Sequence, residues 1–286
     1  YYHQFLKEQP DLNWRNPAVV DAMHSVMRFW LDLGVSGFRV DAFINLLEDP
    51  QLRNEHIDPS WDGPPVTAGY EKLIHTRTEN QPGMHAILRG LQGVLQEFGK
   101  DRMMIGEVYA DKVVSEQDVM SYYGSKDKPE FNMPFNFALV PFFGASFTAK
   151  TGGNDFRNGT ALRRTVDHYD SLVPRWAQPN WVLGNHDNRR VRSRVGGSEQ
   201  LARSLMVLLL SLRGTPTIYN GDEIGMLDGY VPPGKRQDPP CKVNFTSGRC
   251  RDPERTPIQW DDDSNAGFTG PATTPWLPVS SDYKNT

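Results

Sequence analysis

The sequence predicts an α/β fold of the (β/α)8 barrel type, because three apolar segments that have the pattern of strands end in carboxylates. These segments and their acidic residues are 35–40 with Asp41, 103–106 with Glu107, and 181–184 with His186 and Asp187. Each interval between them is long enough for the helix and loop that connect parallel strands. Carboxylates at the carboxyl ends of successive parallel strands are where a (β/α)8 barrel builds its active site.

Helical periodicity and capping residues place helices before, between and after these strands. Asn16 followed by Pro17 predicts the start of the first helix, which ends near Gly34. The predicted helices are 17–33, 84–98, 114–123, 160–176 and 200–212, the last of them buried, and further strands are expected at 131–137 and 215–219. Residues 1–16 and 48–81 have the composition of loops. The final stretch, rich in Pro, Asp and Gly, shows no helical periodicity.

Composition argues against two classes of protein. The chain of 286 residues has a formal net charge of −4, with acidic and basic residues mixed and no basic stripe for nucleic acid. No stretch of about 18 apolar residues occurs in it, so we expect no membrane-spanning helix. One domain of barrel size accounts for the length.

The first strand end places a cation beside a carboxylate. Side chains alternate along a strand, so Arg39 and Asp41 are expected to point to the same side. The arginine then favours the ionised form of Asp41, as a nucleophile requires. Glu107 follows an apolar run without a neighbouring cation, so desolvation is expected to raise its pKa, as a general acid requires. A structural ion pair is the alternative interpretation of Arg39 and Asp41.

The strand ends also carry the signatures of a known family. They are FRVDA at 38–42, GEVY at 106–109, GNHDN at 184–188, YNGDEIG at 219–225, RDPERTPIQWD at 251–261 and NAGF at 265–268. The chain thereby resembles the alpha-amylase family (glycoside hydrolase family 13), and within it the animal alpha-glucosidases or maltases. The resemblance implies that residues 1–286 are the C-terminal part of a catalytic barrel, from about strand 4 to just after strand 8. Strands 1–3 and a C-terminal β domain would then lie outside this sequence.

The resemblance implies a retaining alpha-glucosidase that hydrolyses terminal α-1,4-linked glucose from maltose-like oligosaccharides, with sucrose as a further substrate. Asp41 would be the nucleophile and Glu107 the acid/base, the two carboxyl groups that cleavage of a glycosidic bond requires. Asp187 would hold the sugar hydroxyls and support the transition state. A carboxylate near Glu107 would further raise the pKa of the acid.

Neighbouring side chains are expected to contact the sugar. The resemblance assigns this role to Arg39, His186 and Arg190, with Arg189 as the competing arginine. A buried structural histidine and solvated surface arginines are the alternatives. Ala42, directly after the nucleophile, is a small residue of the kind that accompanies α-1,4 preference in related enzymes, where valine accompanies α-1,6 linkages. A branched side chain there would narrow the site.

A calcium site is also implied by the resemblance, whereas no organic cofactor is expected. Its ligands would be Asp11, Asn45, Leu46 and Glu48, with backbone carbonyls contributed by Asn45 and Leu46. Hard oxygen ligands of this kind suit calcium. The ion would be structural and would fix the loop after Asp41.

Cysteines and glycosylation sequons indicate the cellular compartment. Cys241 and Cys250 lie close together in a Pro- and Gly-rich loop, and Asn158 and Asn244 begin two sequons. Together they favour a secretory-pathway protein with one local disulfide over a cytosolic protein with two free thiols. We therefore expect a secreted or extracellular location. The disulfide should hold the shape of its loop more than it stabilises the fold.

Two other functions are considered beside the exo-acting glucosidase. The heavy subunits of some amino-acid transporters share this fold and much of this sequence and act as membrane-anchored partner proteins. Several of them lack the catalytic carboxylates, which this chain keeps. An endo-acting amylase is the second alternative, against which the 251–261 and 265–268 signatures argue. The expected partner is a small oligosaccharide and not a nucleic acid, while a membrane anchor outside this sequence and the oligomeric state are left open.

Overall fold

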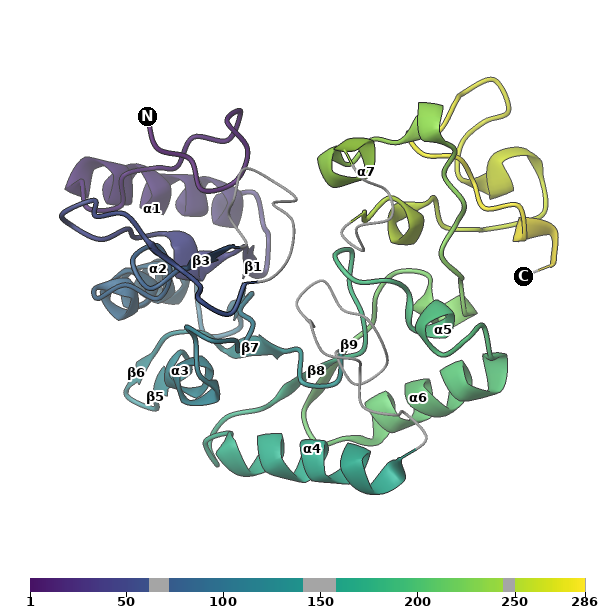
Figure 1. Cartoon of the computed structure of the whole chain (residues 1–286). Coiled ribbons are helices and arrows are strands. Elements are labelled where there is room, and N and C mark those ends of the chain that lie inside the picture. Colours follow the sequence, from purple (N-terminus) through teal and green to yellow (C-terminus); the bar gives the residue numbers. More distant parts are fainter. Residues whose placement is uncertain (62–71, 141–157, 244–249, 286) are drawn as a thin grey trace. The chain divides into compact units, whose positions relative to one another are not determined.

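The chain divides into two compact units, which are described in turn. The computed structural model describes residues 1–61, 72–140, 158–243 and 250–285. The first unit contains residues 1–136 and 171–180, and the second contains residues 137–170 and 181–286. Figure 1 shows the helices and strands of both.

Parallel strands organise the first unit (Figure 1). In their order in the sheet they are β1 (Gly37–Val40), β4 (Met103–Gly106) and β7 (Met133–Asn136). Val40 of β1 is paired with Gly106 of β4, and Gly106 is paired with Pro134 of β7. Because the strands are parallel and end in register, Asp41 and Glu107 leave the sheet at the same edge.

Two long helices pack against each other beside this sheet. They are α1 (Pro17–Asp32) and α2 (Met84–Glu97). The side chain of Asn16 accepts a hydrogen bond from the N–H of Ala18 and caps α1, as the Asn-Pro pair predicts. Apolar side chains at helical spacing on the two helices bury together with the middle of β4, chiefly Met27, Leu31, Leu88, Leu95 and Met104.

Smaller elements complete the first unit. They are α3 (Glu116–Ser121), the antiparallel pair β2 (His56–Ile57) and β3 (Leu73–Ile74), and the hairpin β5 (Gly124–Ser125) and β6 (Lys128–Pro129). The pair β2 and β3 lies within residues 48–81, which the sequence had predicted to be loop throughout. These strands are short and exposed or half-buried, so alternation of polar and apolar residues gives little signal.

An aromatic cluster supports the end of β4. The rings of Tyr122 and Phe131 each lie 4.7 Å from the ring of Phe43, between centroids. A Cβ atom on Gly106 would come within 2.5 Å of the Phe131 ring, so only glycine fits at this position. The close contact fixes the backbone from which Glu107 projects.

The second unit contains most of α4 and β8 and all of the later elements. They are α4 (Gly159–Leu172), β8 (Asn180–Val182), α5 (Val191–Arg194), α6 (Glu199–Ser211), β9 (Thr215–Thr217) and α7 (Pro239–Val243). Strands β8 and β9 are adjacent in the sheet. The buried Trp181 ring donates a hydrogen bond from Nε1 to the carbonyl of Arg213 at 2.8 Å, which ties the middle of β8 to the segment before β9.

Two expectations for this unit are corrected. Helix α6 is not buried all round: Leu205 and Leu209 are buried, but Val207 and Leu210 are exposed, because helical spacing brings only one stripe to the core. A short helix, α7, occurs in the final stretch, where five residues are too few for periodicity to reveal. The predicted disulfide between Cys241 and Cys250 is present.

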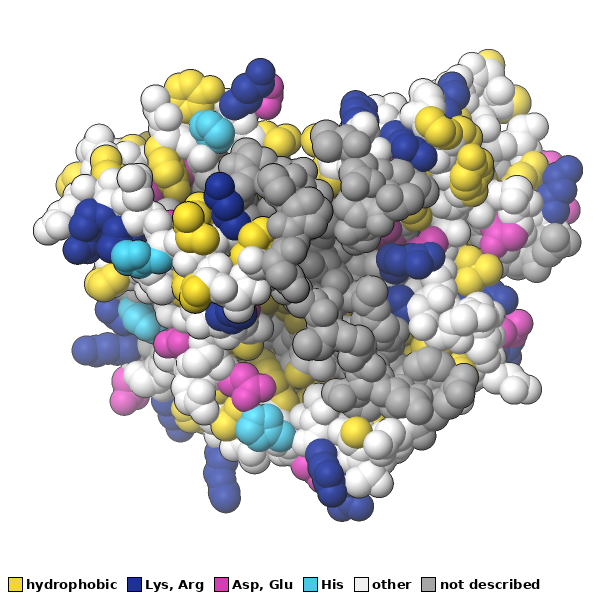
Figure 2. Space-filling model, viewed as in Figure 1, with side chains coloured by type: hydrophobic (Ala, Val, Ile, Leu, Met, Phe, Trp, Pro, Cys, Tyr) yellow, Lys and Arg dark blue, Asp and Glu magenta, His cyan; other side chains and the backbone are white. Residues whose placement is uncertain are grey.

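No helix within the described residues is long and apolar enough to cross a membrane. On the face shown in Figure 2, the lysine and arginine side chains of the described residues are scattered among acidic and polar ones. That distribution agrees with the mixed charge pattern of the sequence. Asn158 is exposed at the start of α4, while Asn244 lies outside the described residues.

Candidate active site

One guanidinium group contacts both carboxyl groups at the edge of the parallel sheet. Arg39 donates from Nη1 to Asp41 Oδ1 at 2.5 Å, and its Nη2 lies 2.7 Å from Glu107 Oε2. Asp41 and Arg39 share one side, as alternation along the strand predicts. The guanidinium carbon lies 6.0 Å from the centroid of the Phe135 ring, which limits the directions the arginine can take.

The two carboxyl groups differ sharply in their exposure. The side chain of Asp41 is 73% exposed, whereas that of Glu107 is 9% exposed. Burial, a hydrogen bond with Asp41 and the charge of Asp41 together raise the pKa of Glu107 to about 7, although Arg39 opposes the shift. The acid is therefore protonated up to about neutral pH, as a proton donor must be.

One expectation about this pair is corrected. Glu107 does have a cation beside it, because the parallel register brings Arg39 of β1 across to it. Neighbouring residues in the sequence could not show this contact, because Arg39 and Glu107 are 68 positions apart. That distance along the chain is enough for a whole βα unit. The pKa of Glu107 is nevertheless raised, because burial and Asp41 together have a larger effect on it than Arg39 has.

Ala42 links the two strand ends through its backbone. Its N–H donates to Glu107 Oε2 at 3.3 Å, and the Glu107 N–H donates to the carbonyl of Val40 at 3.0 Å. Ala42 has φ 38° and ψ 39°, in the left-handed region that residues other than glycine rarely adopt. Strained backbone of this kind is concentrated at functional sites, where the surrounding structure holds it in place.

The third predicted carboxylate, Asp187, lies in the second unit beside His186. His186 Nε2 is 3.4 Å from Asp187 Oδ2. Arg251 and Arg255 both donate to Asp187 Oδ1, at 2.8 and 2.7 Å. In the sequence these two arginines are only part of a family signature. No signal in neighbouring residues pairs them with Asp187, which lies in a distant segment of the chain.

The two candidate arginines after Asp187 have different surroundings. The side chain of Arg190 is 2% exposed; its Nη1 donates to the carbonyl of Asn220 at 2.9 Å, and its guanidinium lies 4.8 Å from the Tyr219 ring centroid. Arg189 is largely exposed and donates to Asp228 at 2.6 Å. These contacts give Arg190 a packing role within its unit, and its contact with a sugar stays a prediction.

The residues of the expected calcium site lie in the first unit. Asp11 Oδ2 accepts from the N–H of Gln4 at 2.6 Å, and Asn45 donates from Nδ2 to the carbonyl of Thr78 at 3.4 Å. Leu46 follows the single turn formed by residues 43–45. Burial and, to a smaller extent, the negative charge of Asp11 raise the pKa of Glu48.

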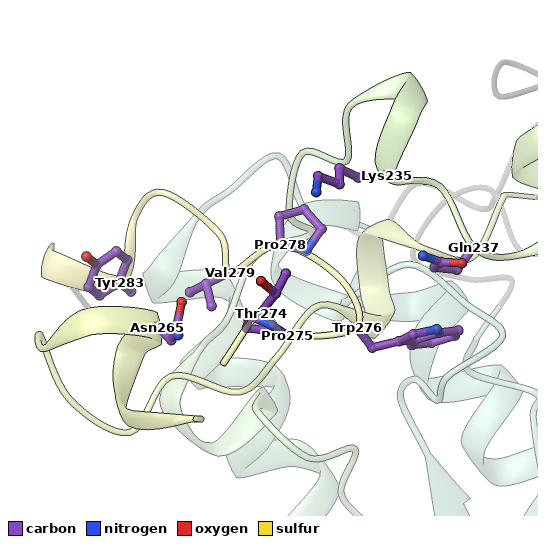
Figure 3. Close-up of a pocket in the computed structure, with 9 residues that line it drawn as sticks. All are labelled: Lys235, Gln237, Asn265, Thr274, Pro275, Trp276, Pro278, Val279 and Tyr283. Carbon is purple, nitrogen blue, oxygen red and sulfur yellow. The ribbon is translucent and has the colours of Figure 1, made fainter. Parts of the chain in front are cut away.

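A pocket of about 380 Å³ in the second unit is separate from these carboxyl groups (Figure 3). Figure 3 shows Trp276 near Gln237 at one end and Tyr283 at the other. The lining residues are Lys235, Gln237, Asn265, Thr274, Pro275, Trp276, Pro278, Val279 and Tyr283. Because they include no carboxyl group, they cannot supply the acid and the nucleophile of glycoside cleavage.

Comparison with known proteins identifies the family. The family model for the alpha-amylase catalytic domain matches residues 1–286. The chain belongs to the alpha-amylase family. The (β/α)8 class that the strand ends predict is thereby confirmed, in agreement with the parallel strands.

Relatives of this alpha-amylase family member include enzymes and a transporter subunit. The salivary alpha-glucosidase of Aedes aegypti is 40% identical over 295 residues, covering 99% of this chain and 48% of the relative. The amino acid transporter heavy chain SLC3A1 of Rattus norvegicus is 36% identical over 288 residues, covering 99% and 38%. The solved structure of an alpha-glucosyl transfer enzyme, XgtA, matches with a TM-score of 0.81 and 31% identity, covering 99% and 50%. The chain therefore spans about half the length of these proteins or less.

Proposed function

We propose that the full-length protein is a retaining alpha-glucosidase that removes terminal α-1,4-linked glucose from maltose-like oligosaccharides and that also hydrolyses sucrose. The observation that carries this proposal is the shared Arg39 contact between the exposed Asp41 and the buried Glu107, whose pKa is raised to about 7. One accessible carboxylate and one protonated carboxyl group are the two components of glycoside cleavage. The alpha-glucosidase names of several relatives support the choice of substrate.

In the proposed mechanism the two carboxyl groups act in turn. Glu107 donates its proton to the glycosidic oxygen while Asp41 attacks the anomeric carbon, so the leaving sugar departs and a glycosyl-enzyme forms. Glu107, now ionised, takes a proton from water, which attacks the anomeric carbon and releases Asp41. Two inversions at one carbon give retention of configuration. Asp187 and His186 would contact the sugar hydroxyls in both steps.

The alternative function is that of a partner protein like a transporter heavy chain. It is favoured by the 36% identity with the SLC3A1 heavy chain of the rat over nearly the whole chain. Glycosidase chemistry is favoured by the presence of Asp41, Glu107 and Asp187 together with the raised pKa of Glu107. A partner protein has no need of an exposed carboxylate beside a buried acid.

The experiment that separates the two functions is hydrolysis by the full-length protein. Maltose, sucrose and isomaltose would be offered separately, and proton NMR would follow the first glucose released from maltose. Rapid release of the α-anomer supports the retaining enzyme, whereas the β-anomer would contradict the mechanism. A folded protein that releases no glucose from any of the three sugars favours the partner-protein alternative.

We expect Ala42→Val to shift preference from maltose toward isomaltose, because a branched side chain beside the nucleophile narrows the site. The left-handed backbone adds a cost, since β-branched residues are rare at positive φ. The measurement is the ratio of kcat/KM for maltose to that for isomaltose, which is insensitive to a general loss of folded protein. Ala42→Gly relieves the backbone and is the control; we expect it to leave the ratio unchanged. An unchanged ratio in Ala42→Val would contradict the steric explanation.

We also propose a structural calcium ion held by Asp11 and Glu48 and by the carbonyls of Asn45 and Leu46. The donor set fits: it is all oxygen, and the negative charge of Asp11 acts on Glu48, an effect that a divalent cation would offset. When bound, the ion would supply positive charge and cross-link residue 11 to the segment after Asp41. The ion and its ligands would thereby fix the position of the loop that follows Asp41 in the sequence.

Removal of calcium is expected to lower stability without changing the reaction. At a free calcium concentration about 100 times its Kd, the ion would stabilise the fold by about 2.7 kcal/mol. Thermal unfolding after dialysis against a chelator, with and without added calcium, measures this difference. Glu48→Gln should lose the calcium response, while the exposed Glu8→Gln should keep it. If metal analysis of the dialysed protein finds no calcium and added calcium leaves Tm unchanged, the protein has no such calcium site.

A secretory location is proposed for the protein. The Cys241–Cys250 disulfide supports it, because disulfides persist in oxidising compartments. The exposed sequon at Asn158 and the similarity to the salivary alpha-glucosidase of Aedes aegypti also support it. Digestion with a glycan-removing amidase would test Asn158, with Asn158→Gln as the variant that should show no shift in mass at that site.

A further inference from the structure

Asp187 is held on one of its two oxygens by a pair of arginines. Arg251 Nη1 and Arg255 Nη2 both donate to Oδ1, at 2.8 and 2.7 Å, while His186 lies on the side of Oδ2. All of these groups belong to the second unit. Charge-assisted hydrogen bonds of this kind are among the stronger polar contacts in proteins. They fix the orientation of the Asp187 carboxylate.

Arg255 holds the backbone as well as the side chain. Its Nε donates to the carbonyl of His186 at 2.7 Å, and its Nη2 donates to the Asp187 carboxylate. One planar guanidinium thus spans two successive residues and fixes the carboxylate relative to the main chain. Rotation of the Asp187 side chain would break the contact with Nη2.

Arg251 is itself held by a buried aspartate. Its Nη2 donates to Asp238 Oδ1 at 2.7 Å and its Nε to Asp238 Oδ2 at 3.1 Å, in a bidentate pair. Asp238 is 3% exposed. Its N–H and that of Gln237 donate to the two carboxylate oxygens of Asp252, which is fully buried, at 2.9 and 2.8 Å. A long side chain that is held in this way loses little further freedom when it contacts Asp187.

The disulfide links the segment that contains Asp238 to the segment that contains Arg251. Cys250 directly precedes Arg251, and the N–H of Cys241 donates to the carbonyl of Asp238 at 2.9 Å. The bond between the two cysteines therefore connects the segment of Asp238 to the segment of Arg251 covalently. This gives the disulfide a specific place in the structure, next to the arginine that contacts Asp187.

We propose that Arg251 and Arg255 are positioning residues that orient Asp187 for catalysis, and that Asp238 and the Cys241–Cys250 disulfide hold Arg251 in place. This inference rests on the proposed glucosidase function. It assigns to the RDPER segment, residues 251–255, a role that acts through Asp187. A side chain that stabilises a transition state is most effective when neighbouring contacts hold it in the required orientation before the reaction begins.

The test is a double-mutant cycle in the full-length protein, with Arg255→Met and Asp187→Ala as single and combined variants. The substrate is an aryl alpha-glucoside, whose good leaving group keeps weak variants measurable. We expect Arg255→Met to lower kcat about 10- to 100-fold, the size of a lost charged hydrogen bond, with a smaller effect on KM. In the Asp187→Ala background the same substitution should change kcat less than about threefold. Arg255→Lys, which keeps the charge and one donor, should recover part of the activity.

Further variants test whether the effect is specific to Arg255 and whether the disulfide holds Arg251 in place. Arg203→Met removes an exposed arginine that pairs with Glu199 on α6, and should leave kcat unchanged. Replacing both cysteines by serine should lower kcat, and should add little when Arg251 has already been changed to methionine. Full activity of the variant with serine at both positions would overturn the role of the disulfide.

Two outcomes would overturn the positioning role. One is unchanged kcat in Arg255→Met; the other is an equal loss with and without Asp187, which would show that the arginine acts independently of it. If Arg255→Met does not fold, Arg255→Lys carries the same cycle. An inactive wild type defeats the proposed function and the positioning role with it. A coupling between Arg255 and Asp187 in the free energy of unfolding would then still show whether their contact exists.

Discussion

Asp41→Asn in the full-length protein is expected to lower kcat/KM for maltose at least about a thousandfold, because the amide cannot form the glycosyl-enzyme. That factor corresponds to about 4 kcal/mol of lost transition-state stabilisation. The fold should be little affected, since the Asp41 side chain is 73% exposed. Hydrolysis of maltose with equal amounts of folded variant and wild type is the measurement.

The same substitution should also alter the acid. Asp41 raises the pKa of Glu107 through a hydrogen bond and through its charge, so removing the charge should lower that pKa. Burial, the largest cause, remains, and keeps the pKa above the ordinary value of a glutamate. Titration of Glu107 by carbon NMR in both proteins would detect the change.

A small-residue variant separates loss of the nucleophile from general damage. With Asp41→Gly and an activated alpha-glucoside, azide should restore turnover and give the β-glucosyl azide, because it attacks from the side that Asp41 occupied. Asp21→Asn, which changes an exposed aspartate on α1, is the matched control and should keep full activity. Full maltose hydrolysis by Asp41→Asn would exclude Asp41 as the nucleophile.

Much of the first unit could be predicted because its signals are local. Apolar runs that end in Asp41 and Glu107 identify strand ends, and parallel strands in register bring such ends to one edge. The cap at Asn16 and the apolar stripes of α1 and α2 likewise depend only on residues close together in the sequence. These elements therefore lie within a few residues of where the periodicity places them.

The contacts that tune the candidate site could not be predicted, because they join distant segments. Arg39 reaches Glu107 only through strand pairing, and Arg251 and Arg255 reach Asp187 from a segment with no regular periodicity. An arginine in a Pro-rich stretch resembles an ordinary surface charge until its carboxylate partner is known. The left-handed backbone of Ala42 also has no signal in the sequence, since alanine does not favour it.

The opposing effects on Glu107 explain how a cation and an acid can share one site. Arg39 stabilises negative charge and alone would lower the pKa of a glutamate. Burial and Asp41 act in the other direction and are the larger effects, so the group remains protonated near neutrality. In the proposed mechanism Asp41 is esterified in the first chemical step and loses its charge, so the pKa of Glu107 should then fall. That change suits the switch of Glu107 from acid to base.

Glu107→Gln is therefore expected to lower kcat/KM for maltose by about 10²- to 10⁴-fold, the usual contribution of a general acid. The loss should be much smaller for α-glucosyl fluoride, because fluoride leaves without a proton in the first step. In the wild type, kcat/KM for maltose should decrease as pH rises through about 7, where Glu107 loses its proton. That decrease should be absent from the residual activity of Glu107→Gln, since glutamine does not titrate.

The comparison of substrates is what makes this prediction specific to an acid. A variant that was merely misfolded would lose activity toward maltose and the fluoride equally, whereas a missing proton donor affects the poorer leaving group more. Glu97→Gln, which breaks an exposed ion pair with Arg28 at the end of α2, should retain both activities and the pH profile. Equal losses on the two substrates, or an alkaline decrease that persists in Glu107→Gln, would assign the acid to another residue.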